Sequence, residues 1–194
     1  MLPNQKRQHY RQLRRAISTG QQQQHALRLC TNINTALRFL RPCRIAAYLA
    51  TQGEISLSPW LNQPSLHQLY LPMLYETTAP RLRFAPINAD TRWHFNRFNI
   101  REPRANWGQT LDARELDIIL MPLVAFDRSG RRLGMGGGYY DRSLAFRNWR
   151  KHWTHPKLIG IAHGCQESEP LPHNPWDIGL DMVITEKEII TVRR

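Results

Sequence analysis

Residues 117–126 read Asp-Ile-Ile-Leu-Met-Pro-Leu-Val-Ala-Phe, a nearly unbroken apolar run. This composition is typical of a strand that other elements cover on both faces, because neither face then needs polar side chains. The run therefore predicts a central strand of a largely parallel sheet. Five shorter runs predict further strands, at 44–50, 69–74, 81–87, 158–162 and 181–185.

Helices are predicted between these strands. Residues 4–17 form a first, Arg-rich candidate, and Ser18 is a suitable cap for a second helix that ends near Leu40. A third candidate covers residues 140–148. Strands that alternate with helices indicate an α/β fold with a largely parallel sheet. No linker-like segment divides the chain, so we expect one domain over residues 1–194.

Composition narrows the class of protein. The chain carries 27 Lys and Arg against 15 Asp and Glu, a formal net charge of +12, and no acidic residue precedes Glu54. Such a surface attracts polyanions, including nucleotides, polyglutamylated small molecules and nucleic acids. No apolar run approaches the roughly 20 residues of a membrane span, so we expect no membrane association. Cys30, Cys43 and Cys165 lie far apart and suit a reducing compartment, so we expect a cytoplasmic protein.

The most informative segment follows the central strand. Residues 132–142 read Arg-Leu-Gly-Met-Gly-Gly-Gly-Tyr-Tyr-Asp-Arg. Four glycines in five positions let backbone N–H groups approach an anion, because no Cβ atom blocks them. Arg132 and Arg142 bracket the segment with positive charge, and Asp141 is a candidate ligand for Mg²⁺ beside phosphates. The segment has neither the Gly-Lys-Ser/Thr ending of a P-loop nor the third glycine of a dinucleotide fingerprint, where Tyr139 stands instead.

This Gly-rich segment, with Met-Pro-Leu-Val-Ala-Phe-Asp-Arg-Ser-Gly-Arg before it, resembles the signature of the 5-formyltetrahydrofolate cyclo-ligases. Other segments resemble blocks of that family in the family's order: RRAIS (14–18), YLATQGEIS (48–56), YLPML (70–74), FNIREP (98–103), GIAHGCQ (160–166) and LPHNPWDIGLDMVIT (171–185). The resemblance implies a three-layer α/β sandwich. It also implies that the chain uses ATP and Mg²⁺ to convert 5-formyltetrahydrofolate, with or without a polyglutamate tail, into 5,10-methenyltetrahydrofolate.

The resemblance assigns ATP binding to a continuous run of residues, Arg132, Leu133, Gly134, Met135, Gly136, Gly137, Gly138, Tyr139 and Tyr140. Some relatives carry a basic residue at the positions of Met135 and Gly137. This chain would therefore contact phosphate there through its backbone, or through a charge supplied elsewhere. Asp141 matches one magnesium ligand of the family and Asp177 a second. Without the resemblance, we would interpret Asp177 as the cap of a helix or turn.

The resemblance places the folate against Tyr139 and three residues from other segments. Glu54 matches an acid that contacts the folate, and a carboxylate is a suitable acceptor for the adjacent N–H donors of a pterin. Leu49 is its apolar neighbour, and Phe98 stands where relatives often carry Trp, as a candidate wall for an aromatic ring. From the residues alone, Glu54 would be a solvated turn acid, and Phe98 remains open between a ring wall and a core aromatic.

A basic pair near the N-terminus, four residues apart, reaches the ATP phosphates in the family. Its second member falls on Arg7 and its first on Pro3, where this chain departs from the pattern. Lys6 and Arg11 are alternatives for the missing charge. The residues alone predict a solvated basic helix face.

Three functional hypotheses remain open from the sequence. The first is the ATP-dependent cyclo-ligase, which needs no protein nucleophile and which we expect to be a monomer. The second is a basic nucleic-acid-binding protein, in which the Gly-rich segment would have no role and no reader motif is recognisable. The third is a different ATP-dependent kinase or ligase on the same segment. The resemblance favours the first, so we expect ATP and 5-formyltetrahydrofolate, and not nucleic acid, as binding partners.

Overall fold

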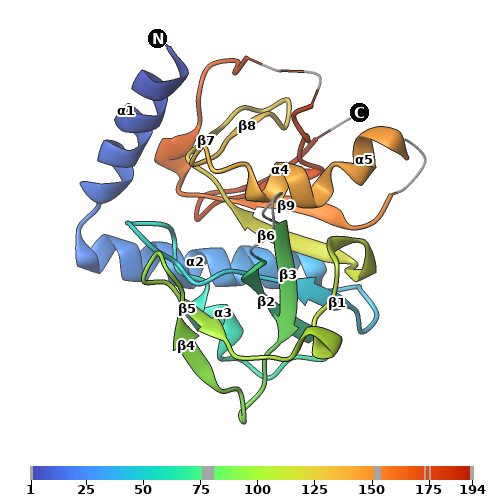
Figure 1. The fold of residues 1–194 in the computed structure, drawn as a ribbon. Coiled ribbons are helices and arrows are strands. Elements are labelled where there is room, and N and C mark those ends of the chain that lie inside the picture. Colours follow the sequence, from blue (N-terminus) through green and yellow to red (C-terminus); the bar gives the residue numbers. More distant parts are fainter. Residues whose placement is uncertain (1, 76–80, 151–153, 173, 175, 193–194) are drawn as a thin grey trace.

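A seven-stranded sheet forms the centre of the computed structural model, which describes residues 2–75, 81–150, 154–172, 174 and 176–192. Its strands are β1 (Arg44–Ala46), β2 (Gln68–Tyr75), β3 (Arg81–Pro86), β6 (Ile118–Pro122), β9 (Lys157–Ile161), β10 (Met182–Ile184) and β11 (Ile189–Thr191). Their order is β11-β10-β9-β6-β1-β2-β3. The five inner strands run parallel, and β3 and β11 pair antiparallel at the two edges. The α/β fold with a largely parallel sheet is confirmed (Figure 1).

Helices pack on both faces of this sheet, with α2 (Thr19–Leu37) and α3 (Ser58–Leu61) on one face and α4 (Tyr139–Leu144) and α5 (Phe146–Trp149) on the other. Helix α1 (Pro3–Arg15) instead contacts η3 (Gly164–Gln166), and the other 3₁₀ turns are η1 (Trp107–Gln109) and η2 (Ala113–Glu115). The cap of α2 is the predicted one, since Ser18 Oγ accepts a hydrogen bond from Gln21 N. No helix in the described part of the chain is long and apolar enough to cross a membrane.

The strand β6 shows how both faces become buried. Ile118 and Leu120 belong to the core on the side of α2, whereas Ile119 and Met121 belong to the core on the side of α4. All four residues are buried. Successive side chains of a strand point to opposite faces, so a strand covered on both sides has no position for a polar residue.

The apolar run over residues 117–126 is nevertheless not one strand. It divides into β6 and β7 (Ala125–Phe126), and β7 pairs with β8 (Arg132–Leu133) in a separate two-stranded sheet. Between β6 and β7, the Leu123 carbonyl accepts hydrogen bonds from Arg14 Nη1 at 3.3 Å and Gln166 Nε2 at 2.8 Å. Because these side chains satisfy the Leu123 carbonyl, this residue needs no strand partner in the large sheet, and the chain can leave the sheet here. The predicted single strand was wrong in this respect.

Other predicted bounds also differ from the structure. The strand predicted over 44–50 ends at Ala46, and beyond it Tyr48 donates through its hydroxyl to the Ile55 carbonyl at 2.7 Å. The helix predicted over 140–148 consists of α4 and α5. The short strands β4 (Trp93–Phe95), β5 (Arg101–Pro103) and β11 were not predicted, because three residues are too few to show a period.

Candidate active site

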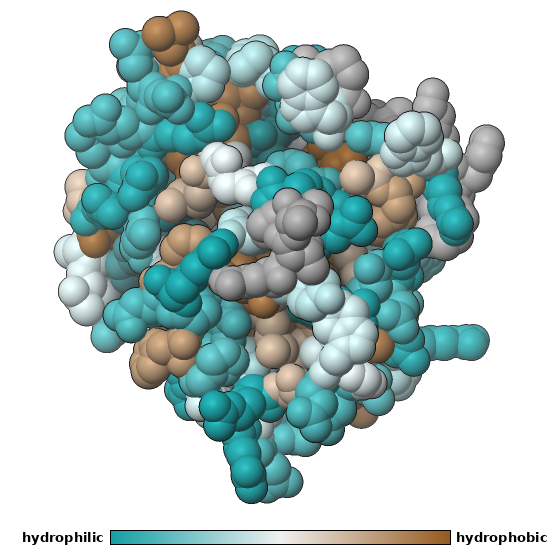
Figure 2. Space-filling view, viewed as in Figure 1, coloured by the Kyte–Doolittle hydropathy of each residue, from teal (hydrophilic) through white to brown (hydrophobic). Residues whose placement is uncertain are grey.

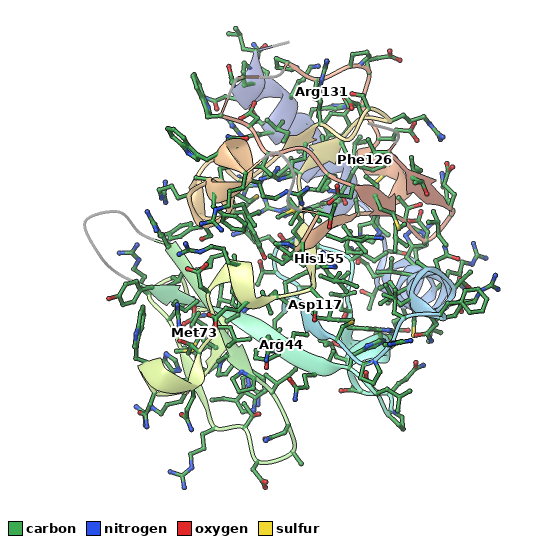
Figure 3. All side chains as sticks on the ribbon, turned by 90° about the vertical axis from the view of Figure 1, so that its right-hand side faces the viewer. Arg44, Met73, Asp117, Phe126, Arg131 and His155 are labelled. Carbon is green, nitrogen blue, oxygen red and sulfur yellow. The ribbon has the colours of Figure 1, made fainter. Side chains whose placement is uncertain are left out.

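One large cavity, of about 1010 Å³, opens at the carboxyl ends of β1 and β6. The chain leaves β1 towards β2 and β3 on one side of the sheet, and returns to β6 on the other side. Ligands of open α/β sheets bind at such a switch point, beyond the carboxyl ends of the strands. Figure 3 shows Arg44 and Asp117, at the amino ends of the same strands, far from the cavity residue Arg131.

All site residues that the sequence predicts line this one cavity. They are Arg7, Leu49, Glu54, Phe98, Arg132, Leu133, Gly134, Met135, Gly136, Gly137, Gly138, Tyr139, Tyr140, Asp141 and Asp177. The structure thus brings together segments that are widely separated in the chain, while the role of each residue stays a prediction. Pro3 also lines the cavity, but neither Lys6 nor Arg11 is among the described lining residues.

The Gly-rich segment offers the cavity a row of backbone donors. Gly136 and Gly138 have positive φ angles of 97° and 65°, and they alternate with residues of negative φ. Such an alternation can turn successive N–H groups to one side, the arrangement found in concave anion sites. The backbone N–H groups of residues 134–138 donate no hydrogen bond within the described part of the chain.

Arginines hold the carbonyl side of this segment. Arg7 Nε donates to the Gly134 carbonyl at 3.0 Å, and Arg142 Nη2 donates to the Gly137 carbonyl at 2.7 Å. Because the carbonyls are occupied by cations, the segment presents positive charge and N–H donors, which suits a polyphosphate. The first two residues of the segment, Arg132 and Leu133, form β8.

Asp141 and Asp177 supply carboxylates next to these donors. Asp141 Oδ1 accepts a hydrogen bond from Arg132 Nη2, and Arg132 also donates to the carbonyl of Ile178. Arg132 therefore ties the two acid-bearing segments together. Asp177 Oδ2 accepts from the backbone and side-chain nitrogens of Asn174, at 2.8 and 3.1 Å. Asp177 is thus a turn cap and a cavity residue at once.

Glu54 lines the same cavity and is largely buried, so its interpretation as a solvated turn acid is wrong. Its side chain is 9% exposed, and Oε2 accepts from Thr51 N at 3.0 Å and from Thr51 Oγ1 at 3.3 Å. Oε1 lies 3.8 Å from Arg14 Nη2. Burial raises the pKa of Glu54, while the Thr51 bonds and the Arg14 charge lower it.

Phe98 and Tyr139 form an aromatic corner in the cavity. Their ring centroids lie 6.4 Å apart in an edge-to-face arrangement, and Arg97 Nη2 donates to the Tyr139 hydroxyl at 2.8 Å. Phe98 is 53% exposed, which excludes a core role. Its loop is held by Asn96 Oδ1, which accepts from Phe98 N and Ile100 N. A planar ring can pack against this corner.

Comparisons with known proteins agree with this geometry. The sequence model of the 5-formyltetrahydrofolate cyclo-ligase family matches residues 3–186. The chain belongs to this family. The chain is 37% identical over 181 residues to the 5-formyltetrahydrofolate cyclo-ligase of Escherichia coli (strain K12), covering 92% of this chain and 97% of the relative. It is 43% identical over 141 residues to that of Haemophilus influenzae, covering 70% and 72%.

The fold also matches a solved structure. The NMR structure of Aquifex aeolicus 5,10-methenyltetrahydrofolate synthetase has a TM-score of 0.83 and 27% identity, covering 100% of this chain and 94% of that one. The chain is thus an enzyme of the cyclo-ligase family, which makes it a ligase of folate metabolism.

Sequence reasoning missed one buried side chain of this cyclo-ligase. Arg14 is fully buried and contacts Gln52, Leu123 and Glu54, although it was interpreted as part of a basic helix face. The signal that could have found it is the helical spacing of Arg7, Arg11 and Arg14, which places the three arginines on one side of α1.

A second group of titratable side chains lies outside the cavity. His25 Nδ1 is 2.9 Å from His163 Nδ1 and 3.8 Å from Glu186 Oε1. Burial lowers the pKa of His163 to about 4, against the opposing charge of Glu186. A neutral His163 can accept the proton of His25 in a hydrogen bond, which accounts for the arrangement without a metal ion.

Proposed function

We propose that the chain catalyses the ATP- and Mg²⁺-dependent conversion of 5-formyltetrahydrofolate into 5,10-methenyltetrahydrofolate, with release of ADP and phosphate. The observation that carries this proposal is a single cavity that is lined both by the Gly-rich segment, with its backbone N–H donors, and by the largely buried carboxylate of Glu54. The matched family supports the reaction. We further propose that residues 1–194 act as one monomeric unit in the cytoplasm, which suits the free Cys30, Cys43 and Cys165.

The reaction has to activate a poor electrophile. The formyl carbon on ring nitrogen-5 is amide-like, and its oxygen is the nucleophilic atom. This oxygen attacks the γ-phosphorus of ATP and forms a new P–O bond while the bond to ADP breaks. Nitrogen-10 then attacks the formyl carbon, its proton leaves, and the C–O bond breaks to release phosphate. The five-membered ring of the methenyl product remains.

The chain's own groups act by position and charge. The N–H groups of residues 134–138, with Arg7 and Arg142 behind them, would hold the phosphates. Glu54 would accept N–H donors of the pterin, and the corner of Phe98 and Tyr139 would pack against a ring. Bringing both substrates together converts a bimolecular encounter into an oriented, intramolecular step. Donors fixed in advance stabilise the charge that develops on the phosphoryl oxygens.

Asp141 and Asp177 are the residues that would hold Mg²⁺. Each carboxylate keeps one oxygen, Asp141 Oδ2 and Asp177 Oδ1, that accepts no hydrogen bond from the described residues. Carboxylate oxygens beside a phosphate site are the donors that Mg²⁺ prefers, so the residues fit the ion. When bound, the ion would neutralise charge on the transferred phosphoryl group.

The proposal is tested by the absorbance of the methenyl product. We expect the chromophore to form only when enzyme, ATP, Mg²⁺ and 5-formyltetrahydrofolate are all present, with one ADP released for each product formed. Tetrahydrofolate, which lacks the formyl group, is the control and should release no ADP. A folded, monodisperse protein that forms no chromophore would refute the function, and ADP release without chromophore would favour another ATP-dependent kinase or ligase.

A further inference from the structure

Arg14 has no exposed surface, although most of the other residues of α1 are exposed. Its Nε donates to the Gln52 carbonyl at 3.1 Å and its Nη1 to the Leu123 carbonyl at 3.3 Å. Its Nη2 has no hydrogen-bond partner in the described structure and lies 3.8 Å from Glu54 Oε1. A buried cation is costly unless it is paired, so this position calls for an explanation.

The loop that Arg14 contacts is strained. Gln52 has a φ angle of 49°, which is uncommon for a residue with a side chain, and the adjacent Gly53 has a φ of 80°. Arg11 Nη2 donates to Gln52 Oε1 at 2.8 Å, so α1 holds Gln52 through two arginines. A Cβ atom on Gly53 would lie 3.3 Å from the Arg14 carbonyl, which shows how closely the loop packs on the helix. Strained loops persist where surrounding contacts determine them.

Arg14 does not itself line the cavity, whereas Glu54, two residues after Gln52, does. We propose that Arg14 is a positioning residue for the folate end of the cavity, which holds the loop of residues 51–54 so that Glu54 faces the substrate as an anion. The inference rests on the proposed function, because it gives Arg14 its role through the substrate contact of Glu54. The nearby Leu123 carbonyl couples the same guanidinium to the point where the chain leaves β6.

Electrostatics agree with this geometry. Burial raises the pKa of Glu54, and Arg14 is the cation that opposes this effect. The other titratable groups that face Glu54 are the hydroxyls of Tyr48 and Tyr140, whose pKa values are raised by burial and then by Glu54 itself, so both stay neutral. Loss of Arg14 would therefore raise the pKa of Glu54 further. Substrate affinity, which needs the anion, would then fall off at a higher pH than in the wild type.

The test compares Arg14→Met with Arg15→Met, its exposed neighbour on the same helix, which loses the same charge. We expect Arg14→Met to raise the KM and the Kd for 5-formyltetrahydrofolate about tenfold, the worth of a charge-assisted contact. The KM for ATP should change less than twofold. The acidic limb of kcat/KM for the folate should move to higher pH. Arg15→Met should match the wild type in all these values.

Two further variants separate positioning from a merely structural role. Arg14→Lys keeps the charge but not the fork that spans Gln52 and Leu123, so it should retain the wild-type pH limb with an intermediate folate KM. In a Glu54→Gln background, Arg14→Met should add almost nothing to the folate Kd, because the residue acts through Glu54.

Several results would overturn the inference. They are an unchanged folate Kd and pH limb in Arg14→Met, equal increases for both substrates, or full additivity with Glu54→Gln. If Arg14→Met does not fold, a wild-type folate KM and Kd in Arg14→Lys overturn it in the same way. The folate Kd, measured by calorimetry, needs no turnover. If the wild type binds the folate but forms no product, the proposed reaction is refuted, and the folate Kd values of the Arg14 variants still decide the role of Arg14.

Discussion

Asp141 is the cavity residue whose charge should matter most for turnover. It is 41% exposed, yet one oxygen is held by Arg132, a side chain of only 7% exposure. Asp141→Asn keeps the shape but removes the charge that would bind Mg²⁺. We expect turnover to fall about a hundredfold, with a raised Mg²⁺ requirement. Asp177→Asn should be milder, because part of its carboxylate caps the turn at Asn174. Initial rates over a Mg²⁺ titration measure both effects.

The matched control is Asp90→Asn, which removes an exposed acid that does not line the cavity. It should leave the rate and the Mg²⁺ dependence at wild-type values. A wild-type Mg²⁺ dependence in Asp141→Asn would contradict the metal role. The Arg132 contact supplies a second check, because a purely structural loss would lower the unfolding temperature together with the rate.

His163 gives the fold a sensitivity to acid. Its pKa is about 4 in the folded protein, where burial opposes the charged form, against about 6.5 in an unfolded chain. Protons therefore bind the unfolded state more readily, so the stability is complete above pH 6.5 and is lost as the pH falls towards 4. At pH 5 the loss is about 2 kcal/mol. His25, Glu186 and Arg14 are the charged or titratable groups around this ring.

Urea unfolding at pH 7 and pH 5 checks this expectation. The free energy of unfolding should fall less between these pH values in His163→Gln than in the wild type, by about 2 kcal/mol. Comparing the two proteins removes the contributions of other titratable groups. Identical pH dependence in both proteins would show that the pKa of His163 is the same in the folded and the unfolded state, and would contradict this expectation.

Helix α1 contacts both the Gly-rich segment and the loop that carries Glu54. Arg7 contacts the Gly134 carbonyl of the Gly-rich segment, and Arg11 contacts Gln52 beside Glu54. Arg7→Gln should therefore raise the KM for ATP several-fold and leave the folate KM nearly unchanged. Arg11→Gln should do the reverse, because it loosens the loop at the folate end. Each variant is the control for the other, since both remove one charge from the same helix.

Steady-state saturation curves for the two substrates separate these effects. If both variants change the ATP curve alone, Arg11 supplies the phosphate contact that Pro3 lacks. If neither variant changes either curve, α1 is a solvated basic helix, as its residues alone predict. The assignment of the reaction would survive this result, because it depends on the Gly-rich segment.

The sequence predicted elements well where a local pattern determines them. Ser18 caps α2 because its hydroxyl and the backbone N–H that it accepts from, that of Gln21, lie three residues apart, and β6 is apolar because both of its faces are covered. An anion site in the Gly-rich segment was predicted from its own residues, whereas Glu54 and Asp177 were assigned to the same site only through the family resemblance. The burial of Arg14 was missed, because only its spacing with Arg7 and Arg11 marks it in the sequence, and its partner Leu123 lies 109 positions away. The division of residues 117–126 into β6 and β7 occurs at Leu123, whose carbonyl accepts the hydrogen bond from Arg14, so no local pattern indicates it either.

At the scale of the whole molecule, the dominant feature is the formal net charge of +12. Figure 2 shows hydrophilic residues over most of the visible face, with hydrophobic residues in small separate groups. Such a surface retains polyanions at low ionic strength by charge alone. We expect binding to RNA or heparin to disappear by about 0.3 M salt, where the screening length is roughly 5 to 6 Å.

Turnover at saturating ATP should persist at that salt concentration, because the cavity contacts are partly buried. Measuring polyanion retention and chromophore formation in the same salt series compares the two. Sequence-selective RNA binding that survives about 0.3 M salt, with no turnover, would instead favour the nucleic-acid-binding hypothesis. The free protein without RNA is the reference for both measurements.

The contact between Arg7 and Gly134 joins residues 127 positions apart, and that between Arg14 and Leu123 spans 109. A ribosome adds about 5 to 20 residues per second, so α1 waits roughly 5 to 20 seconds before its partners exist. An isolated helix of 13 residues is marginal in water, so α1 is not stably helical during this time. Its many arginines keep it soluble meanwhile. The helix that contacts both the Gly-rich segment and the loop beside Glu54 is thus synthesised early and docks late.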